Sequence, residues 1–327
     1  MSQDNTSKVL FIGGVGRSGS TLLDMLLGQI GGFCSTGELR FIWDRGFGQN
    51  QLCGCGKPFK ECDFWMDVVR EAFGGFENVN YERLAALRDS IERRIITKRV
   101  SFKALSEILT SYDEYRNAYG NLYRAIHKVS GCEIIVDSSK HVAHGYILAT
   151  IPEIDLFTTH LVRDSRAVAY SWRRKKVRPE IHGGKHYMAQ RGLLKSAGRW
   201  NHRNIMAHKL QDTSKQYAFL RYEDLVINPK DTLSNLLADL KIQRTSLDFL
   251  DGFRANLKTS HTVSGNPMRF ERKEINIQPD MQWQYDMPKY HQWLVTLLTW
   301  PLLLKYGYFR DSRPREGSVI APFLLKR

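Results

Sequence analysis

The sequence predicts an α/β fold in which a mostly parallel β-sheet is flanked by helices. Three observations predict it: short apolar runs alternate with longer helical stretches, a glycine-rich segment joins the first apolar run to a helix, and polar or charged residues follow several of the runs. Strands that alternate with helices favour a parallel sheet covered on both faces. The 327 residues contain no internal repeat and no low-complexity linker, so we expect a single domain, 1–327.

The candidate strands are short and apolar. They are Val9–Ile12, Glu133–Val136, Leu156–Val162 and Tyr217–Leu220, with a further short extended segment at Phe33–Thr36. Ligands of parallel sheets bind beyond the carboxyl ends of the strands. We therefore expect the functional residues to follow these runs directly.

The composition is that of a globular protein with a strongly basic region. The chain has 48 Lys and Arg against 34 Asp and Glu, a net charge of +14, and residues 160–210 alone hold 13 basic and two acidic residues. Such a stretch attracts a polyanion, whether nucleic acid, anionic lipid or a phosphorylated nucleotide. The alternative is a solvated basic helix face.

Neither end of the chain predicts a targeting segment or a membrane span. The polar start Met1–Lys8 leads into Val9–Ile12, which is too short for the core of a signal peptide, so a cytoplasmic location is expected. Trp293–Leu304 is strongly apolar but short, and it contains Pro301. This segment predicts a buried or partly interfacial helix pair, with loose membrane contact as the less favoured alternative.

Five cysteines are too few for a disulfide scaffold in a chain of this length. Three of them are close in sequence, Cys53, Cys55 and Cys62. A structural zinc site normally has four ligands, and the nearby Cys34 and Asp63 do not complete a familiar spacing. A glycine-rich surface loop or one local disulfide is therefore favoured, and no metal is expected.

The first polar motif is a phosphate-binding loop. It directly follows the first candidate strand and opens a helix, and its residues are Gly13-Gly14-Val15-Gly16-Arg17-Ser18-Gly19-Ser20-Thr21. Glycines allow backbone N–H groups to turn toward one anion, and the helix N-terminus and two hydroxyl groups add further donors. The fold class is therefore a P-loop-type parallel sheet.

The departure of this loop from the nucleoside-triphosphatase pattern is informative. Gly14 and Gly19 have the usual spacing, but Ser20 stands where kinases and GTPases have the lysine that reaches the β- and γ-phosphates. Arg17 instead offers a guanidinium fork to a phosphate or sulfate oxygen. These residues argue against a phosphoryl-transferring enzyme, which remains an alternative.

Here the chain resembles the sulfotransferases that use 3′-phosphoadenosine-5′-phosphosulfate (PAPS), in particular the tyrosylprotein and bacterial branches. Their P-R-S-G-[ST]-T-type loop corresponds to Gly16-Arg17-Ser18-Gly19-Ser20-Thr21, with Gly16 in place of proline. The resemblance implies that this loop grips the 5′-phosphosulfate. The nucleotide core would then span about 8–62, 131–178 and 216–275, with helical insertions at about 63–130 and 180–215 and a C-terminal helical segment at about 288–310.

A second motif follows the strand Leu156–Val162. Arg163 stands at the strand end, Asp164 or Ser165 can cap the next helix, and Ser171 lies about two turns into it. In the resembled family the corresponding segment binds the 3′-phosphate through an arginine and a serine, which match Arg163 and Ser171. We expect the basic run 173–176 to continue the helix, so that Lys175 could reinforce this site.

Two weaker matches complete the predicted nucleotide site. The segment 261–270 looks like the C-terminal nucleotide-binding loop of the family in its G-N-P-x-R-F form, so Ser264 and Arg269 are candidate 3′-phosphate ligands. The alternative for this segment is an ordinary surface turn. Tyr222 matches the tyrosine of R-Y-E-D-L, which lies near the nucleotide, or it is a structural aromatic residue.

The resemblance also implies the catalytic groups. Glu38, in Gly37-Glu38-Leu39-Arg40, is similar to the catalytic carboxylate of tyrosylprotein sulfotransferases and is our first candidate for the base. Lys140 matches the lysine that stabilises charge on the bridging oxygen, together with Arg17. His141 is the rival base, because other sulfotransferase branches use a histidine in this region.

The sequence therefore predicts transfer of a sulfuryl group from PAPS to a hydroxyl acceptor, a carbohydrate, phenol or peptide tyrosine, with release of PAP and without a metal. The alternatives are a P-loop phosphotransferase and a nucleic-acid-binding protein that uses the basic 160–210 surface. We expect no nucleic acid partner, because that reading leaves Arg17 without a role. Aromatic residues of the insertions, such as Trp65, Tyr115 and Trp200, would suit either stacking on an acceptor or packing in a core.

Overall fold

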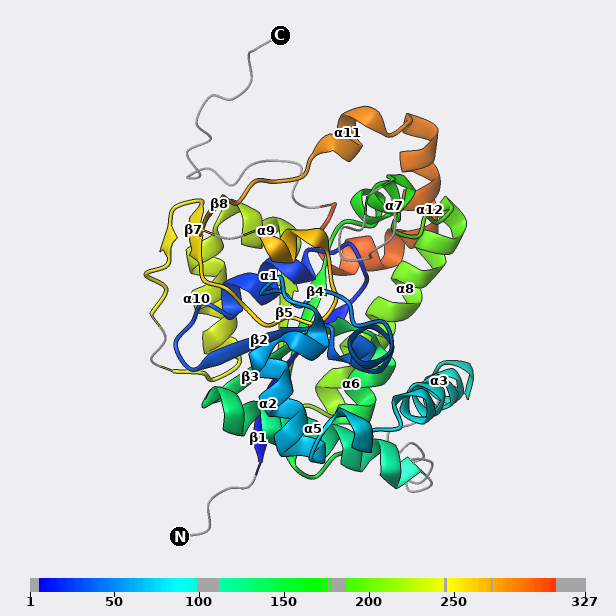
Figure 1. Ribbon diagram of the computed structural model, residues 1–327. Coiled ribbons are helices and arrows are strands. Elements are labelled where there is room, and N and C mark those ends of the chain that lie inside the picture. Colours follow the sequence, from blue (N-terminus) through cyan, green and yellow to red (C-terminus); the bar gives the residue numbers. More distant parts are fainter. Residues whose placement is uncertain are drawn as a thin grey trace.

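The centre of the computed structural model is a five-stranded parallel sheet with the strand order β2-β3-β1-β4-β5 (Figure 1). The structure describes residues 6–98, 112–175, 177, 186–243, 246–271 and 273–309. The strands are β1 (Ser7–Gly14), β2 (Phe33–Gly37), β3 (Ile134–Lys140), β4 (Ile154–Val162) and β5 (Gln216–Arg221). Each includes one of the five predicted runs or most of it, so the predicted α/β class is confirmed.

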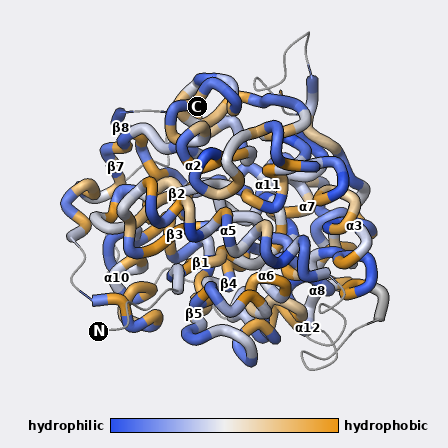
Figure 2. Tube along the Cα trace, turned by 60° about the horizontal axis from the view of Figure 1, so that its bottom comes forward, coloured by the Kyte–Doolittle hydropathy of each residue, from blue (hydrophilic) through white to orange (hydrophobic). Residues whose placement is uncertain are grey.

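Alternating side chains of β1 supply two cores, one on each face of the sheet. Val9 and Phe11 belong to a core that includes residues of α2 (Asp63–Phe73), α5 (Asp113–Ser130) and α6 (Val142–Leu148). Leu10 and Ile12 belong to a second core, with α1 (Ser20–Leu27), α9 (Tyr222–Ile227) and α10 (Pro229–Asp239). Figure 2 shows apolar residues along these strands and polar residues on outer turns. Burial on both faces explains why the run Val9–Ile12 of β1 is continuously apolar.

A compact aromatic region follows β2. The short helical turns η1 (Leu39–Phe41), η2 (Ile42–Gly48, a π-helix) and η3 (Phe59–Glu61) lead into α2, and η4 (Phe76–Asn78) leads into α3 (Tyr81–Lys98). Trp65 and Tyr115 are fully buried here, and Trp200 of α8 (Leu193–Lys209) is fully buried elsewhere. These three aromatic residues therefore pack in cores and do not present rings to an acceptor.

The C-terminal helices pack near β4, where Val162 lies in one small core with Trp200 and Leu303. α7 (Ser165–Arg173) and α8 both pack against α12 (Lys289–Lys305), which α11 (Gln282–Asp286) precedes, and η6 (Leu210–Asp212) follows α8 (Figure 1). Pro301 lies inside α12, so the expected helix pair is one helix. Val295, Thr299 and Leu303 form its buried side, whereas Trp293 is 74% exposed. Among the residues that the structure describes, no helix is both long and apolar enough to cross a membrane.

A second, antiparallel sheet was not expected from the sequence. It consists of β6 (Leu250–Asp251), β7 (Arg254–Leu257) and β8 (Lys273–Asn276), in that order. The chain between β7 and β8 returns to the main sheet before η7 (Pro267–Phe270), and Val263 pairs there with Gly37 at the end of β2. The Glu38 N–H donates to the Val263 carbonyl at 2.7 Å, and the Val263 N–H donates to Thr36 at 2.8 Å. This return segment, residues 258–266, therefore lies beside the carboxyl ends of the parallel strands.

Candidate functional site

The glycine-rich loop has the strand, loop and helix context that the sequence predicts. It connects β1 to α1, and Gly14 and Gly19 both adopt positive φ. A Cβ atom on Gly14 would lie 2.4 Å from the Leu161 carbonyl oxygen, and one on Gly19 would lie 2.3 Å from the Tyr222 ring. Only glycine permits this path, which brings the loop backbone against β4 and α9.

Arg17 presents a cation without a matching anion in this loop. All three of its guanidinium nitrogens are buried and make no hydrogen bond, and the guanidinium carbon lies 5.0 Å from the centroid of the Trp172 ring. Burial lowers the pKa of this guanidinium, and the nearby Glu38 carboxylate opposes that shift. A buried polar group without a partner is costly, so the arrangement suits an anionic ligand that would supply the missing acceptors.

Glu38 and Lys140 form an ion pair at the ends of two adjacent strands. Glu38 follows β2 and Lys140 ends β3, and the distance from Lys140 Nζ to Glu38 Oε1 is 2.5 Å. Lys140 also donates to the Ser138 carbonyl at 3.1 Å and adopts a left-handed backbone conformation with φ of 61°. The structure therefore brings together a candidate base and a candidate cation. Glu38 also raises the pKa of Arg17 through its charge, so the ion pair lies near the P-loop.

His141 faces a different group of residues. Its Nδ1 lies 3.3 Å from Glu92 Oε2, and the Glu92 carboxylate receives two hydrogen bonds of 2.5 Å from Arg40. Burial lowers the pKa of His141 well below its ordinary value, and Arg203 and Arg40 add to this shift. The ring is therefore neutral near pH 7, and its polar neighbours are Glu92 and Arg40.

Arg163 lies against the P-loop, as the second motif predicts. It donates to the Arg17 carbonyl at 3.2 Å and to the Asp280 carbonyl at 3.2 Å, and its guanidinium carbon lies 4.4 Å from the centroid of the Tyr222 ring. Asp164 caps α7 by accepting from the Arg166 N–H at 2.8 Å. Tyr222 thus contacts both Arg163 and the Gly19 backbone, and Ser171 is buried on α7.

Three other predicted ligands have different surroundings. α7 ends at Arg173, so the expected helical path through 173–176 is wrong, and Lys175 Nζ instead lies 4.4 Å from the centroid of the Tyr187 ring. Ser264 accepts a hydrogen bond from Arg45, a cation that the sequence did not single out. Arg269 is buried, and it donates to the carbonyls of Thr262 and Leu52 at 2.7 Å each. The Arg269 guanidinium group therefore binds the carbonyl groups of loop residues.

The loop that contains Ser264 nevertheless lies close to the P-loop. The Asn266 N–H donates to Thr21 Oγ1 at 3.4 Å. A Cβ atom on Gly265 would lie 3.8 Å from both Thr21 Oγ1 and Glu38 Oε1. The return segment therefore borders the same site as Glu38, although the Arg269 side chain is engaged elsewhere.

A cluster of arginines extends the positive charge away from the P-loop. The Arg191 guanidinium carbon lies 3.5 Å from the centroid of the Trp172 ring, which Arg17 also approaches. Burial, and then the charge of Arg199, lower the pKa of Arg191 and of Arg203 to about 10. The basic stretch 160–210 predicted a positively charged region, but it did not indicate which of its arginines lie close together. A neighbouring like charge lowers the pKa of a cation because it disfavours the charged form, so these arginines form a region of concentrated positive charge.

Three cysteines and a histidine of the return segment form a second cluster. The ligand atoms of Cys53, Cys55, Cys62 and His261 all lie within 4.8 Å of one another. All five cysteines are thiols in the structure. The structure therefore does not contain the local disulfide that the sequence favoured as one alternative. Spacing in the sequence could not reveal the fourth member, because His261 lies 199 positions beyond Cys62.

Comparison with known protein families identifies the family of this chain. A family model described as the sulfotransferase family matches residues 10–246. No curated protein matches the sequence.

Among solved structures, the sulfotransferase domain of the Synechococcus PCC 7002 olefin synthase is similar, at 20% identity and a TM-score of 0.48, over 92% of this chain and 96% of that domain. The sulfotransferase domain of the curacin biosynthetic pathway is 15% identical, with a TM-score of 0.47, over 92% of this chain and 98% of that one. Because the family model spans more than half of the sequence, the chain belongs to the sulfotransferase family and is a transferase of sulfuryl groups.

Proposed function

We propose that the chain, acting as one sulfotransferase domain, transfers the sulfuryl group of PAPS to a hydroxyl acceptor and releases PAP. The observation that carries this proposal is the buried, unpartnered guanidinium of Arg17 in a P-loop that has Ser20 where ATP and GTP enzymes have lysine. A sulfuryl group carries less charge than a phosphoryl group. Fixed cations can therefore supply the stabilisation that Mg²⁺ supplies in kinases.

The residues around the P-loop fit a donor with two anionic ends. Arg17, the loop amides and the hydroxyls of 18, 20 and 21 would hold the 5′-phosphosulfate, and the Ser18 hydroxyl is itself buried without a partner. Arg163, which donates to the Arg17 carbonyl of this loop, and Ser171, which is buried on α7, would hold the 3′-phosphate. Tyr222 would border the nucleotide between them. Ser264, Arg269 and Lys175 are secondary candidates, because they contact Arg45, two loop carbonyls and the Tyr187 ring, whereas Arg163 contacts the P-loop itself as well as Asp280.

Glu38 and Lys140 supply the chemistry in this proposal. As the acceptor oxygen bonds to sulfur and the bond from sulfur to the bridging oxygen breaks, Glu38 takes the hydroxyl proton. Lys140 and Arg17 stabilise the charge that develops on the departing oxygen. The Glu38 N–H bond to Val263 and the ion pair with Lys140 fix the carboxylate before the acceptor arrives.

The arginine cluster supports an acceptor that itself carries negative charge. The Arg191 guanidinium lies against the Trp172 ring, which Arg17 also approaches, and the charge of Arg199 lowers the pKa of both Arg191 and Arg203 after burial. Such a cluster attracts anions and repels cations. Among the carbohydrate, phenol and peptide acceptors that we consider, we therefore favour acidic ones.

The experiment that tests the donor is a comparison of two nucleotides. PAP should raise the melting temperature of the protein, because a ligand that binds only the folded state stabilises it, whereas ATP with Mg²⁺ should not. Arg163→Ala and Ser171→Ala should reduce the shift. Arg254→Ala, an exposed arginine of β7, is the matched control and should leave the shift unchanged. No shift with PAP but a clear one with ATP and Mg²⁺ would favour the phosphotransferase.

The salt dependence of nucleic acid binding and its competition with PAP distinguish the enzyme from a nucleic-acid-binding protein. Its binding to DNA or RNA would weaken steeply with salt concentration and would survive an excess of PAP. We expect that PAP displaces any nucleic acid that the basic surface attracts near the P-loop.

A further inference from the structure

The cysteine and histidine cluster has the dimensions of a tetrahedral metal site. Sulfur atoms of Cys55 and Cys62 are 3.6 Å apart, as are those of Cys62 and Cys53. His261 Nδ1 lies 3.2 Å from Cys62 Sγ and 3.8 Å from Cys53 Sγ. Zinc binds sulfur at about 2.3 Å and histidine nitrogen at about 2.0 Å, so a tetrahedron places sulfurs about 3.8 Å apart and sulfur about 3.5 Å from nitrogen. The observed distances lie close to both values.

We propose that Cys53, Cys55, Cys62 and His261 bind one structural zinc ion. The donor set is three sulfurs and one imidazole nitrogen, and Cys₃His is an established structural zinc set. A disulfide would instead require two sulfurs at about 2.05 Å and would leave the third thiol and the histidine without a role. Four protein ligands fill the tetrahedron, so the ion has no open position for a substrate and acts on structure.

The local backbone holds the three cysteines in one tight loop. Leu52 pairs with Pro58 across the loop, and the Cys53 N–H donates to the Lys57 carbonyl at 2.8 Å. Cys62 stands at the N-terminal end of α2, so the third ligand is placed by a regular helix. These local contacts bring the three cysteines together, and the Gly54 N–H connects the loop to the Thr262 carbonyl at 3.0 Å.

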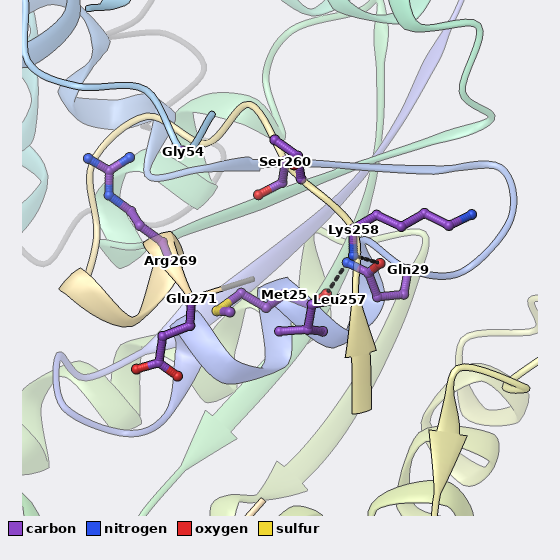
Figure 3. Close-up of a pocket in the computed structure, with 9 residues that line it drawn as sticks. Met25, Gln29, Gly54, Leu257, Lys258, Ser260, Arg269 and Glu271 are labelled. Atoms are coloured by element: carbon purple, nitrogen blue, oxygen red, sulfur yellow. Dashed lines mark hydrogen bonds between the residues drawn. The ribbon is translucent and has the colours of Figure 1, made fainter. Parts of the chain in front are cut away.

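The fourth ligand is also held in place by neighbours. The His261 ring stacks on Phe64 at a centroid distance of 4.9 Å, and Trp65 Nε1 donates to the His261 carbonyl at 3.0 Å. The return segment can approach this closely because residue 54 is glycine: a Cβ there would lie 2.4 Å from Thr262 Oγ1 and 2.7 Å from the Ser260 carbonyl. Figure 3 shows Gly54, Ser260 and Arg269 around one shallow depression at this contact.

The proposed ion would connect the cysteine loop to the segment that borders the active site. His261 is two residues before Val263, which pairs with β2 and accepts from the Glu38 N–H. Arg269 reinforces the same junction through the Thr262 and Leu52 carbonyls. A zinc ion here would hold the return segment against β2 and so support the position of Glu38. The inference does not depend on the identity of the sulfuryl donor.

Metal analysis of the full chain tests the proposal. Protein purified without chelators in a reducing buffer should contain one zinc per chain by plasma mass spectrometry. Cys62→Ser and His261→Ala should lose it, whereas Cys132→Ser, which removes a buried cysteine outside the cluster, should keep it. No retained zinc in the wild type after zinc addition and desalting, or equal loss in Cys132→Ser, would overturn the proposal.

Two measurements on the wild type keep the test valid where a cluster variant fails to fold. Titration with an organomercurial should release the zinc in step with the modification of three thiols, and cobalt in place of zinc should give thiolate charge-transfer bands and the strong visible bands of a tetrahedral ion. Release without thiol modification, octahedral cobalt bands, or an intact mass showing a disulfide within 53–62 would each contradict the site. Removal of the ion should lower the melting temperature.

Discussion

Lys140 Nζ lies 2.5 Å from Glu38 Oε1, although the two residues are 102 positions apart. The contact exists because β2 and β3 are neighbours in the sheet and both end beside the P-loop. Both side chains are mostly buried, so the pair is shielded from water and salt. A carboxylate and an ammonium group are thereby fixed next to the unpartnered Arg17 guanidinium.

Replacement of the proposed base should separate turnover from binding. Glu38→Gln keeps the shape of the side chain, so PAP affinity should stay within about threefold while turnover falls about 10²–10⁴-fold, the usual value of a general base. His141→Ala should cost much less, because that ring faces Glu92 and Arg40. Single-turnover rates at saturating PAPS measure the turnover of both variants. Near-normal turnover in Glu38→Gln with collapse in His141→Ala would transfer the role to the histidine.

Loss of the paired lysine should also affect the transition state most. Lys140→Ala should reduce turnover by at least about tenfold more than it weakens PAP binding, because a cation at the bridging oxygen matters most as charge develops. Lys57→Ala removes an exposed lysine that pairs with Asp63, and it should change neither quantity. Equal losses in affinity and turnover for Lys140→Ala would show that the lysine acts through donor binding instead.

The P-loop backbone should tolerate no side chain at residue 19. Gly19→Ala forces a Cβ to within 2.3 Å of the Tyr222 ring at a φ of 89°, so we expect a loss of at least about 1 kcal/mol in the free energy of unfolding and about tenfold weaker PAP binding. Gly198→Ala, in an exposed turn of α8 with open space around the new methyl group, should be neutral or stabilising. Chemical unfolding and calorimetry measure the two effects. Wild-type behaviour of Gly19→Ala would show that the loop rearranges.

A buried histidine should make stability fall in acid. His160 Nδ1 lies 2.8 Å from the Tyr217 hydroxyl and Nε2 lies 3.0 Å from Asn204 Oδ1, and burial lowers the pKa of His160 to about 4. The unfolded chain, with a pKa of about 6.5, binds more protons between pH 6.5 and 4. This residue therefore removes stability as pH falls through that window, by at most about 1.4 kcal/mol per pH unit.

Unfolding in urea at several pH values tests this contribution. The difference in stability between the wild type and His160→Gln should shrink as the pH falls from 7 to 4.5. His127→Gln, an exposed histidine of α5, controls for the loss of a histidine elsewhere. Parallel pH profiles for the wild type and His160→Gln would show that the residue is protonated in the folded state as readily as in the unfolded one.

Local patterns predicted the strands and the loop that carry the candidate site. The five parallel strands, the P-loop and the cap at Asp164 all depend on residues close in sequence, so apolar runs, glycine spacing and capping residues were enough to find them. The closeness of Glu38 and Lys140 also followed, because the ends of parallel strands meet at one edge of a sheet.

Contacts between distant segments could not be predicted in this way. His261 joins Cys62 only because the return segment passes beside β2, and the same path directs Arg269 to backbone carbonyls rather than to the nucleotide site. Lys175 was misplaced because the helix stops at Arg173. Pro301 suggested a break between two helices, but α12 packs against α7 and α8 and continues through it.

Transfer of label from ³⁵S-PAPS to a panel of hydroxyl compounds, with and without acidic groups, tests whether the protein is a PAPS-dependent sulfotransferase. We predict that the wild type transfers the label to at least one acidic hydroxyl acceptor and releases PAP, and that Arg17→Ala does not. Transfer of ³²P from γ-labelled ATP in the presence of Mg²⁺, with no ³⁵S transfer from PAPS to any acceptor, would contradict the account.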